Sequence, residues 1–399
     1  MAVAQPWGCQ FHHGCFVTRA VWFLVLLLLL LGLVASPLHA EEPQAERTDW
    51  HYGTYLDLNY TVNFNFPENH QFRSRTTTSR GNELSPNVAL GYVRKDITAQ
   101  SRWGMELAVQ GGYDTKEFAF GQDRPLLGGA DTLRHFSRAN VSYLAPVGKG
   151  LTFTAGLFNS LIGYESLYAK DNANYTRSWI ADNSPYMMFG LGARYPVSDD
   201  LTASLYVING YWHLANPNSL PSYLTQLVWQ PTGRVTVTEN LYYGPDQRNT
   251  NIEFWRLFSD YIIEWKGENL TVAFSYDFGT ENIAGQTGRP RAFWTGGALF
   301  TRWNIVGPWS LAVRPEIYWD RNARQTGFEQ FVRALTTTLE YKVPIASSNT
   351  VLRLEHRYDD STGVEGGFFK RGEVRPGVPG LMREQHLLIL ALLWTFDSP

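Results

Sequence analysis

Apolar and polar residues alternate along residues 52–66 of this chain. The apolar and aromatic positions are Tyr52, Leu56, Leu58, Tyr60, Val62 and Phe64, and the positions between them include Gly53, Asp57, Asn59, Thr61 and Asn63. Since successive side chains of a strand point to opposite faces, this pattern predicts a strand with one apolar and one polar face. A half-buried strand of a soluble β-sandwich would show the same alternation. A single segment therefore leaves a soluble sandwich and a membrane barrel both open.

The same alternation recurs along the whole chain, and helical periodicity is rare. About sixteen segments are predicted to be strands on this criterion. Clear examples lie at residues 103–114, 151–160, 235–243, 270–279 and 309–320. The recurrence predicts an all-β fold.

The connections between the predicted strands alternate in length. The long ones lie near residues 67–82, 115–131, 161–184, 210–220, 244–251, 280–290, 321–328 and 361–383. The short ones lie at residues 95–100, 146–150, 196–200, 231–233, 266–269, 304–308 and 344–349. Their Gly, Pro, Asn and Asp residues favour turns. Short turns at one end and long loops at the other predict a closed antiparallel transmembrane β-barrel of about 16 strands, with short periplasmic turns and long extracellular loops.

Aromatic residues make up 15% of the chain, and several tryptophans lie near predicted strand ends. These are Trp103, Trp229, Trp265, Trp309 and Trp319. Outer-membrane barrels carry aromatic girdles at the two membrane interfaces. Because every backbone amide in lipid needs a partner, a membrane sheet has to close on itself. The alternative is that the aromatic residues only fill a soluble core.

An unbroken apolar run at residues 20–35 precedes the predicted strands. It predicts an export signal, and an uncleaved membrane anchor is the alternative. The predicted parts are a signal peptide at residues 1–40, a periplasmic N-terminal segment at residues 41–50 and the barrel at residues 51–399. Both cysteines, Cys9 and Cys15, lie before the run, so the exported part does not depend on disulfides. The expected location is the bacterial outer membrane.

The last predicted strand, at residues 387–396, has an aromatic end. Its apolar face consists of Leu388, Leu390, Leu392, Trp394 and Phe396. A terminal aromatic strand resembles the signal that the barrel-assembly machinery recognises in outer-membrane proteins. We therefore expect this machinery and outer-membrane lipid as partners. Three residues follow Phe396, which departs from a strictly terminal phenylalanine.

A series of short motifs follows in one order along the chain. The first half contains Gly156-Leu157-Phe158, Gly163-Tyr164-Glu165-Ser166, Asn174-Tyr175-Thr176-Arg177-Ser178, Asn209-Gly210-Tyr211 and Tyr243-Gly244-Pro245. The second half contains Asp277-Phe278-Gly279, Arg314-Pro315-Glu316 with Asp320, Thr336-Thr337-Thr338-Leu339-Glu340-Tyr341, and the residues from Leu352 to Asp359. In this series the chain resembles the putative β-barrel porin-2, OmpL-like family over most of its length after residue 40. The resemblance implies a barrel and a porin, and it carries no catalytic residue across.

The predicted strand count favours a pore, because about eight strands leave an interior filled by side chains whereas about sixteen leave an aqueous channel. Charged residues are costly towards lipid, so those on the polar faces are predicted to line the channel. These pore-lining candidates are Asp57, Asn59, Glu106, Gln110, Arg134, Arg138, Arg194, Arg256, Asp277, Arg314, Glu316, Glu340, Lys342, Arg353, Glu355, Arg357 and Asp359. The strand count and this polar lining together predict an outer-membrane porin for passive diffusion of small hydrophilic solutes. The charges of the candidates are nearly balanced, which predicts no strong ion selectivity. The alternative is that Arg314, Glu316, Glu340, Arg353 and Glu355 form structural ion pairs between neighbouring strands.

The third long connection, at residues 161–185, is the candidate constriction. In general porins the corresponding loop folds into the lumen and narrows it, so this role rests on resemblance. The candidate residues are Tyr164, Glu165, Tyr168, Tyr175 and Arg177. We expect Glu165 to face lumen arginines such as Arg134 and Arg138. An ordinary surface loop is the alternative.

Other functions have little support in the sequence. An outer-membrane hydrolase would need a serine beside a histidine, and local spacing places none beside His135 or His356. We expect no enzyme, no metal site, no cofactor and no nucleic-acid partner, since basic stripes and phosphate-binding glycine loops are not found. A substrate-specific channel and a scaffold that is not a pore remain alternatives. A homo-oligomer is possible, but nothing in the sequence marks its interface.

Overall fold

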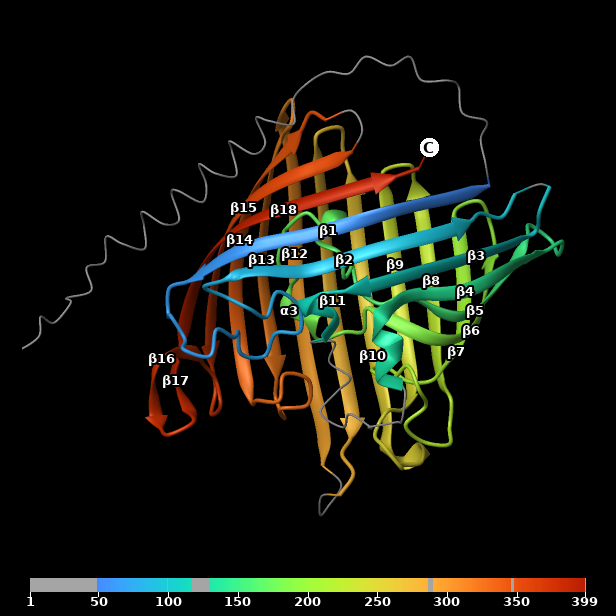
Figure 1. Cartoon of the computed structure of the whole chain (residues 1–399). Helices are drawn as coiled ribbons and strands as arrows, with labels where there is room; N and C mark the ends of the chain where they lie inside the picture. The colour runs from blue at the N-terminus through green and yellow to red at the C-terminus, as the bar shows by residue number, and fades with distance from the viewer. Residues whose placement is uncertain (1–48, 99, 117–129, 286–289, 346–347, 399) are drawn as a thin grey trace, which may run out of the picture. The chain divides into compact units, whose positions relative to one another are not determined.

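The computed structural model describes residues 49–98, 100–116, 130–285, 290–345 and 348–398. Within these ranges sixteen strands form one closed antiparallel barrel (Figure 1). They are β1 (Trp50–Asn63), β2 (Leu84–Lys95), β3 (Trp103–Gly111), β4 (Phe136–Ala145), β5 (Leu151–Asn159), β6 (Met187–Pro196), β7 (Leu201–Ile208), β8 (Ser222–Thr232), β9 (Val235–Pro245), β10 (Trp255–Lys266), β11 (Leu270–Asn282), β12 (Arg291–Val306), β13 (Trp309–Asp320), β14 (Gln330–Val343), β15 (Asn349–Thr362) and β18 (Glu384–Asp397). The same ranges contain no helix that is long and apolar enough to cross a membrane. The predicted signal peptide at residues 1–40 lies outside them, as does most of the segment 41–50.

The first and last strands close the barrel. β1 pairs with β2 on one side and with β18 on the other, and the register places Leu58 opposite Leu392. A separate hairpin, β16 (Phe368–Arg375) and β17 (Val378–Met382), lies in the connection between β15 and β18. Because every wall strand has two neighbours, the wall has no free edge, as a lipid environment requires. The predicted fold class is therefore confirmed.

The two faces of β1 have the orientation that its alternation predicts. Asp57 and Asn59 lie inside the barrel with 0% and 2% of their surface exposed. Leu56 and Leu58 lie on the outer wall and are partly exposed. The same alternation of exposure continues in β13 and β14, because side chains change faces at every residue of a strand.

The long and short connections lie at opposite ends of the barrel, which we call the long-loop end and the short-turn end. Residues 267–269 connect β10 to β11, and residues 307–308 connect β12 to β13, at the short-turn end. Residues 64–83 and 160–186 are connections at the long-loop end. This segregation agrees with the predicted alternation of lengths.

Several predicted strand boundaries are wrong, and β3 and β11 are two examples. The strand expected at residues 103–114 ends at Gly111, because Gly112 adopts a φ of +123° that turns the chain. Asp114 therefore lies in a short helix, α2 (Tyr113–Lys116). In the other case β11 continues to Asn282, into the loop predicted at residues 280–290.

The tryptophans that were expected in girdles lie on the outer wall. Trp103, Trp265 and Trp309 lie near the short-turn end with 39–47% of their surface exposed. Trp229 also lies towards this end, and Trp319 lies towards the long-loop end. Their position next to the strand ends is typical of the two interfaces of an outer-membrane barrel.

Candidate functional site in the barrel lumen

Residues 160–186, which we call the lumen segment, leave β5 and fold into the barrel before the chain enters β6. The segment contains a 3-10 turn, η2 (Ala169–Asp171), and a short helix, α3 (Trp179–Asp182), which Figure 1 shows enclosed by the strands. Near the start of the segment, Gly163 adopts a φ of +93°, which is in the region that favours glycine. The Gly163 N–H donates to Asp260 Oδ2 on β10 at 2.8 Å.

Wall carboxylates bind the backbone of the lumen segment. The N–H groups of Tyr175 and Thr176 donate to the two oxygens of Glu355 at 2.6 and 3.0 Å. The Trp179 N–H donates to Glu316 Oε2 at 2.5 Å, and its indole N–H donates to Asp359 Oδ1 at 2.8 Å. Glu355, Glu316 and Asp359 therefore pair backbone and side-chain donors that would otherwise be left without partners at membrane depth.

Wall arginines bind the carbonyl groups of the same segment. Arg353 donates to Ala169 O and to Asn172 O, both at 2.7 Å. Arg314 donates to Thr176 O at 2.6 Å, and Arg357 donates to Arg177 O at 2.9 Å. A guanidinium group has five donors, so one arginine can bind several carbonyls and a carboxylate together.

The same arginines form buried ion pairs. The Arg353–Glu340 pair has an N–O distance of 2.7 Å, the Arg314–Glu316 pair 3.2 Å and the Arg357–Asp359 pair 2.8 Å. Arg314, Arg353 and Arg357 have at most 1% of their surface exposed. Arg353 and Glu340 lie opposite each other on β15 and β14, and Glu316 lies two residues after Arg314 on β13. Of these pairs, Arg353–Glu340 has the geometry of the alternative that the sequence left open, an ion pair between neighbouring strands, whereas Arg314 and Glu316 pair along one strand.

The partner expected for Glu165 is wrong. Glu165 Oε1 lies 2.7 Å from Arg314 Nη1 on β13. Arg138 instead pairs with Glu106 on the neighbouring strand at 2.8 Å. Arg134 is not a wall residue, because it lies in the 3-10 turn η1 (Ala130–His135) before β4, and its carbonyl accepts from Gln110.

The remaining candidates of the lumen segment are also held inside the barrel. The Tyr168 hydroxyl donates to Gln110 Oε1 at 2.8 Å, and the Tyr175 hydroxyl donates to Asp57 Oδ1 at 2.7 Å. The Tyr164 hydroxyl donates to Glu264 at 2.8 Å, on β10. Arg177 is fully buried and lies 3.2 Å from Asp114. The segment thus contacts opposite walls, β1 on one side and β10 on the other.

Apolar side chains complete this contact. Leu387 and Ile389 of β18 point inwards and are buried together with Tyr168 and Tyr175. Trp179 and Ile180 of α3 are buried towards β12 and β13, and the centroid of the Tyr164 ring lies 4.8 Å from that of the Phe300 ring. The inward face of β18 is therefore apolar because protein, not water, covers it.

A second loop reinforces the lumen segment, and the sequence reasoning did not identify it. Arg75, in the connection 64–83, lies 2.8 Å from Asp182 of α3 and donates to Arg177 O at 2.8 Å. Thr77 donates to the Asp182 carboxylate at 2.7 Å. No local pattern marks Arg75 or Asp182, because the two residues are brought together only when both loops fold inwards.

Burial also changes the acidity of one carboxyl group at the long-loop end. Asp114 lies in α2, beyond the end of β3. Burial, with a further contribution from the nearby acids Asp57 and Asp182, raises the pKa of Asp114 to about 7, although Arg177 and the Thr78 N–H act in the opposite direction. The Asp114 carboxyl group lies at the contact between the lumen segment and α2, so a group at this contact changes its protonation near neutral pH.

Most pore-lining candidates lie at inward positions, but they differ in what covers them. The covered ones, with at most 6% of their surface exposed, are Asp57, Asn59, Gln110, Arg256, Asp277, Arg314, Glu316, Glu340, Arg353, Glu355, Arg357 and Asp359. Arg256 is held by Asp246 at 2.7 Å and by Glu281 at 2.9 Å. Arg194 on β6 and Lys342 on β14 are inward and exposed, near the short-turn end, and within the described ranges neither has an ion pair. The lumen thus has a filled long-loop half and a more open short-turn half.

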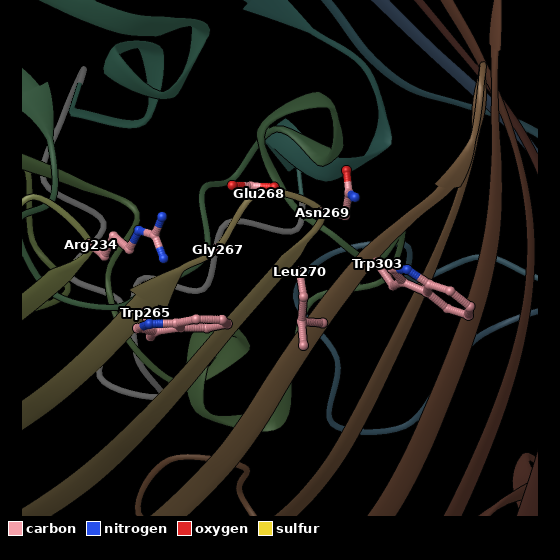
Figure 2. A pocket seen from close by; sticks show the side chains of 7 residues that line it. All are labelled: Arg234, Trp265, Gly267, Glu268, Asn269, Leu270 and Trp303. Carbon is pink, nitrogen blue, oxygen red and sulfur yellow. The ribbon is translucent and has the colours of Figure 1, made fainter.

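A pocket of about 560 Å³ lies at the short-turn end, on the outside of the barrel. Figure 2 shows Trp265, Leu270 and Trp303 beside one another, with the turn 267–269 and Arg234 next to them. The two indoles are 39% and 49% exposed. Trp265 and Trp303 belong to the aromatic girdle, and the pocket between them is not part of the lumen.

Comparisons with known proteins agree with this architecture. The model of the family described as "Putative beta-barrel porin-2, OmpL-like" matches residues 50–396. No curated protein matches the chain.

Solved outer-membrane porins have a similar fold. An anion-selective porin from Comamonas acidovorans superposes with a TM-score of 0.51 at 9% identity, over 87% of this chain and 99% of that one. OmpT of Vibrio cholerae, an outer-membrane protein, gives 0.51 at 8% identity, over 88% and 99%. Salmonella typhi OmpF, solved in complex with daunomycin, gives 0.51 at 9% identity, over 87% and 97%. At this identity the likeness concerns the fold alone.

Proposed function

Because the chain belongs to the putative β-barrel porin-2, OmpL-like family, we propose that it is a passive channel for small hydrophilic solutes, with the lumen segment as its constriction. The family and the closed sixteen-strand barrel place the protein in the bacterial outer membrane. About sixteen strands enclose a lumen wide enough for water, so what fills that lumen decides what passes.

The observation that carries this proposal is the attachment of the lumen segment to opposite walls. It contacts β1 through Tyr175, β13 through Glu165 and β10 through Tyr164. A segment held on several sides cannot swing out without breaking buried hydrogen bonds. Solutes therefore pass beside a fixed constriction and then reach the more open short-turn half.

The remaining parts of the proposal concern delivery to the membrane. Residues 1–40 act as the signal peptide, and β18 presents its outward face, ending in Trp394 and Phe396, to the barrel-assembly machinery. Leu388, Leu390 and Leu392 lie on the same outward face as these aromatic residues. Outer-membrane lipid then covers the wall.

A hydrolase on the outer wall is not part of the proposal. His356 Nε2 lies 3.3 Å from His386 Nδ1, so its neighbour is a second histidine. His135 lies in η1 at the long-loop end, and not on the outer wall. A porin family and a porin fold together favour transport over catalysis.

Single-channel conductance in planar bilayers tests the proposal. Deletion of residues 164–177 removes the part of the lumen segment that crosses between the walls, and we expect conductance to rise several-fold. Deletion of residues 369–382, a segment of equal length in the β16–β17 hairpin, is the matched control and should leave conductance unchanged. Heat-modified migration in gels shows whether each variant has folded.

Each outcome has a defined meaning. If a folded 164–177 deletion conducts like the wild-type protein, the lumen segment is not the constriction. If neither the wild-type protein nor this deletion conducts, and liposomes that contain them take up no sugar, the channel function itself is wrong.

A further inference from the structure

The outer wall carries a carboxylate at membrane depth. Other outward charged residues, such as Arg291, Arg333 and Glu384, lie in the part of their strands nearest the long-loop end. Glu239 instead lies in the middle of β9, with Val237 and Leu241 on the same face. It is partly exposed, and within the described residues its carboxylate has neither a hydrogen bond nor an ion pair.

Two phenols continue the polar row that begins at Glu239. The register places Glu239 opposite Tyr261 on β10, and Tyr261 opposite Tyr276 on β11. Tyr261 is 46% exposed and Tyr276 is 40% exposed, so both rings stand on the outer wall. Directly opposed side chains on one face of a sheet are neighbours, at about 5 Å between their Cβ atoms. Both tyrosines lie in the middle of their strands, away from the interfaces where tyrosine usually lies.

The outer wall has a glycine, Gly297, at the position next to this row. Tyr276 lies opposite Gly297 on β12, so the row ends at a position without a Cβ atom. A Cβ atom at Gly297 would meet only ordinary contacts, with 3.4 Å to the nearest atom, Ser275 O. Gly297 is therefore not required by crowding within the chain, and it leaves room beside Tyr276 for a group from outside.

Lipid chains cannot satisfy this row. An ionisable side chain that faces hydrocarbon is costly, and such residues usually have a protein partner. A carboxyl group needs a donor, whereas a phenol needs an acceptor. A second copy of the same wall supplies both, because a two-fold axis places a surface against itself.

We propose that the outer face of β9, β10 and β11 around Glu239, Tyr261 and Tyr276 is the contact surface between two copies of this chain within the membrane. Glu239 of each copy accepts a hydrogen bond from Tyr261 or Tyr276 of the partner subunit. The contact occurs twice, once on each side of the axis. The proposal concerns association only and does not depend on whether the barrel conducts.

Sedimentation equilibrium in density-matched micelles tests the proposal with the full-length protein. We expect the wild-type protein to form dimers, and Glu239→Leu to raise the dissociation constant by about tenfold or more, as the loss of a hydrogen bond to a charged group implies. The matched control is Thr337→Leu, which replaces a polar by an apolar residue at an outward position of β14 and should leave the constant unchanged. The double variant Tyr261→Phe and Tyr276→Phe removes only the two donors and should weaken association like Glu239→Leu.

Three results would overturn the proposal. One is a wild-type protein that stays monomeric at all concentrations. Another is association that is as strong in Glu239→Leu and in the double phenylalanine variant as in the wild-type protein. The third is a trimer instead of a dimer, which would exclude the two-fold arrangement. A disulfide-linked dimer of Leu241→Cys, without one for Leu335→Cys on β14, would place the contact on β9 directly.

Discussion

The inward charges on β13, β14 and β15 differ from those near the short-turn end in what they contact. Arg314, Arg353 and Arg357 are almost fully buried, and each binds both a carboxylate and a backbone carbonyl of the lumen segment. Arg194 and Lys342 also point inwards but are exposed. An inward arginine of a barrel is therefore not by itself a channel residue, because a loop that folds inwards can convert it into a structural one.

The difference has an energetic basis. A buried ion pair contributes little net stability compared with apolar residues, but removal of one partner leaves an unpaired buried charge. Carbonyl groups of the lumen segment would lose their donors as well. The covered arginines are thus required to hold the lumen segment in its position. The exposed cations, Arg194 and Lys342, act only through their electric field in the water of the lumen.

The largest effect is expected for a covered arginine. Arg353→Leu removes one of the two arginines that pair with Glu340, since Arg302 remains, and it leaves the buried carbonyls of Asn172 and Asn174 without this donor. The free energy of unfolding should therefore fall by about 2–4 kcal/mol. The measurement is urea unfolding of the reconstituted barrel, followed by tryptophan fluorescence. Arg194→Leu is the matched control and should change this free energy by less than about 0.5 kcal/mol. Equal losses in the two variants would remove the distinction between covered and open arginines.

The open cations should act on selectivity instead. The double variant Arg194→Glu and Lys342→Glu replaces two exposed positive charges by negative ones, so the permeability for cations relative to anions should rise several-fold. The zero-current potential across a bilayer with a salt gradient measures this ratio. Arg333→Glu alters a charge on the outer wall and should leave it unchanged. A ratio that responds equally to Arg333→Glu would show that the effect is not located in the lumen.

Thiol labelling should separate three environments in the folded protein. A cysteine at position 194 should react quickly with a water-soluble reagent, whereas one at position 58 should be protected by lipid. A cysteine at position 59 should be protected by the lumen segment, since Asn59 is only 2% exposed, and should become reactive when residues 164–177 are deleted. Reaction at position 59 in the full-length barrel would show that this wall is open to water.

The last effect is expected at Asp114, and it concerns the dependence of stability on pH. Its pKa is raised to about 7 in the folded protein, so the folded state holds a proton that the unfolded state has released above its usual pKa. Stability should therefore fall as the pH rises from about 4 to about 7. Asp114→Asn should reduce this slope, measured as the midpoint of thermal unfolding against pH. Asp199→Asn, at an almost fully exposed carboxylate, should leave the slope unchanged.

Much of the wall could be predicted, whereas the contacts of the lumen could not. Leu58 and Asn59 were assigned to opposite faces because neighbouring residues of a strand must face opposite ways. The predicted partners of Glu165 were wrong because its partner, Arg314, is 149 residues away in the sequence. Local spacing does not predict a contact between residues so far apart. The constriction residues came from resemblance to general porins, not from any pattern within the segment itself.

By itself, the sequence determined which residues face the lumen and which face outwards, and it predicted that the sheet closes. The reason is local: a strand has a period of two, and lipid and water differ so strongly that each strand must show the difference in its own residues. Only the tertiary structure decided which inward charges are covered. That outcome depends on where two loops fold inside the barrel, on pairs such as Arg75 and Asp182, and on hydrogen bonds that a strand pattern cannot contain. The alternation of apolar and polar residues therefore defines a wall, and the loops decide how much of its inner face meets water.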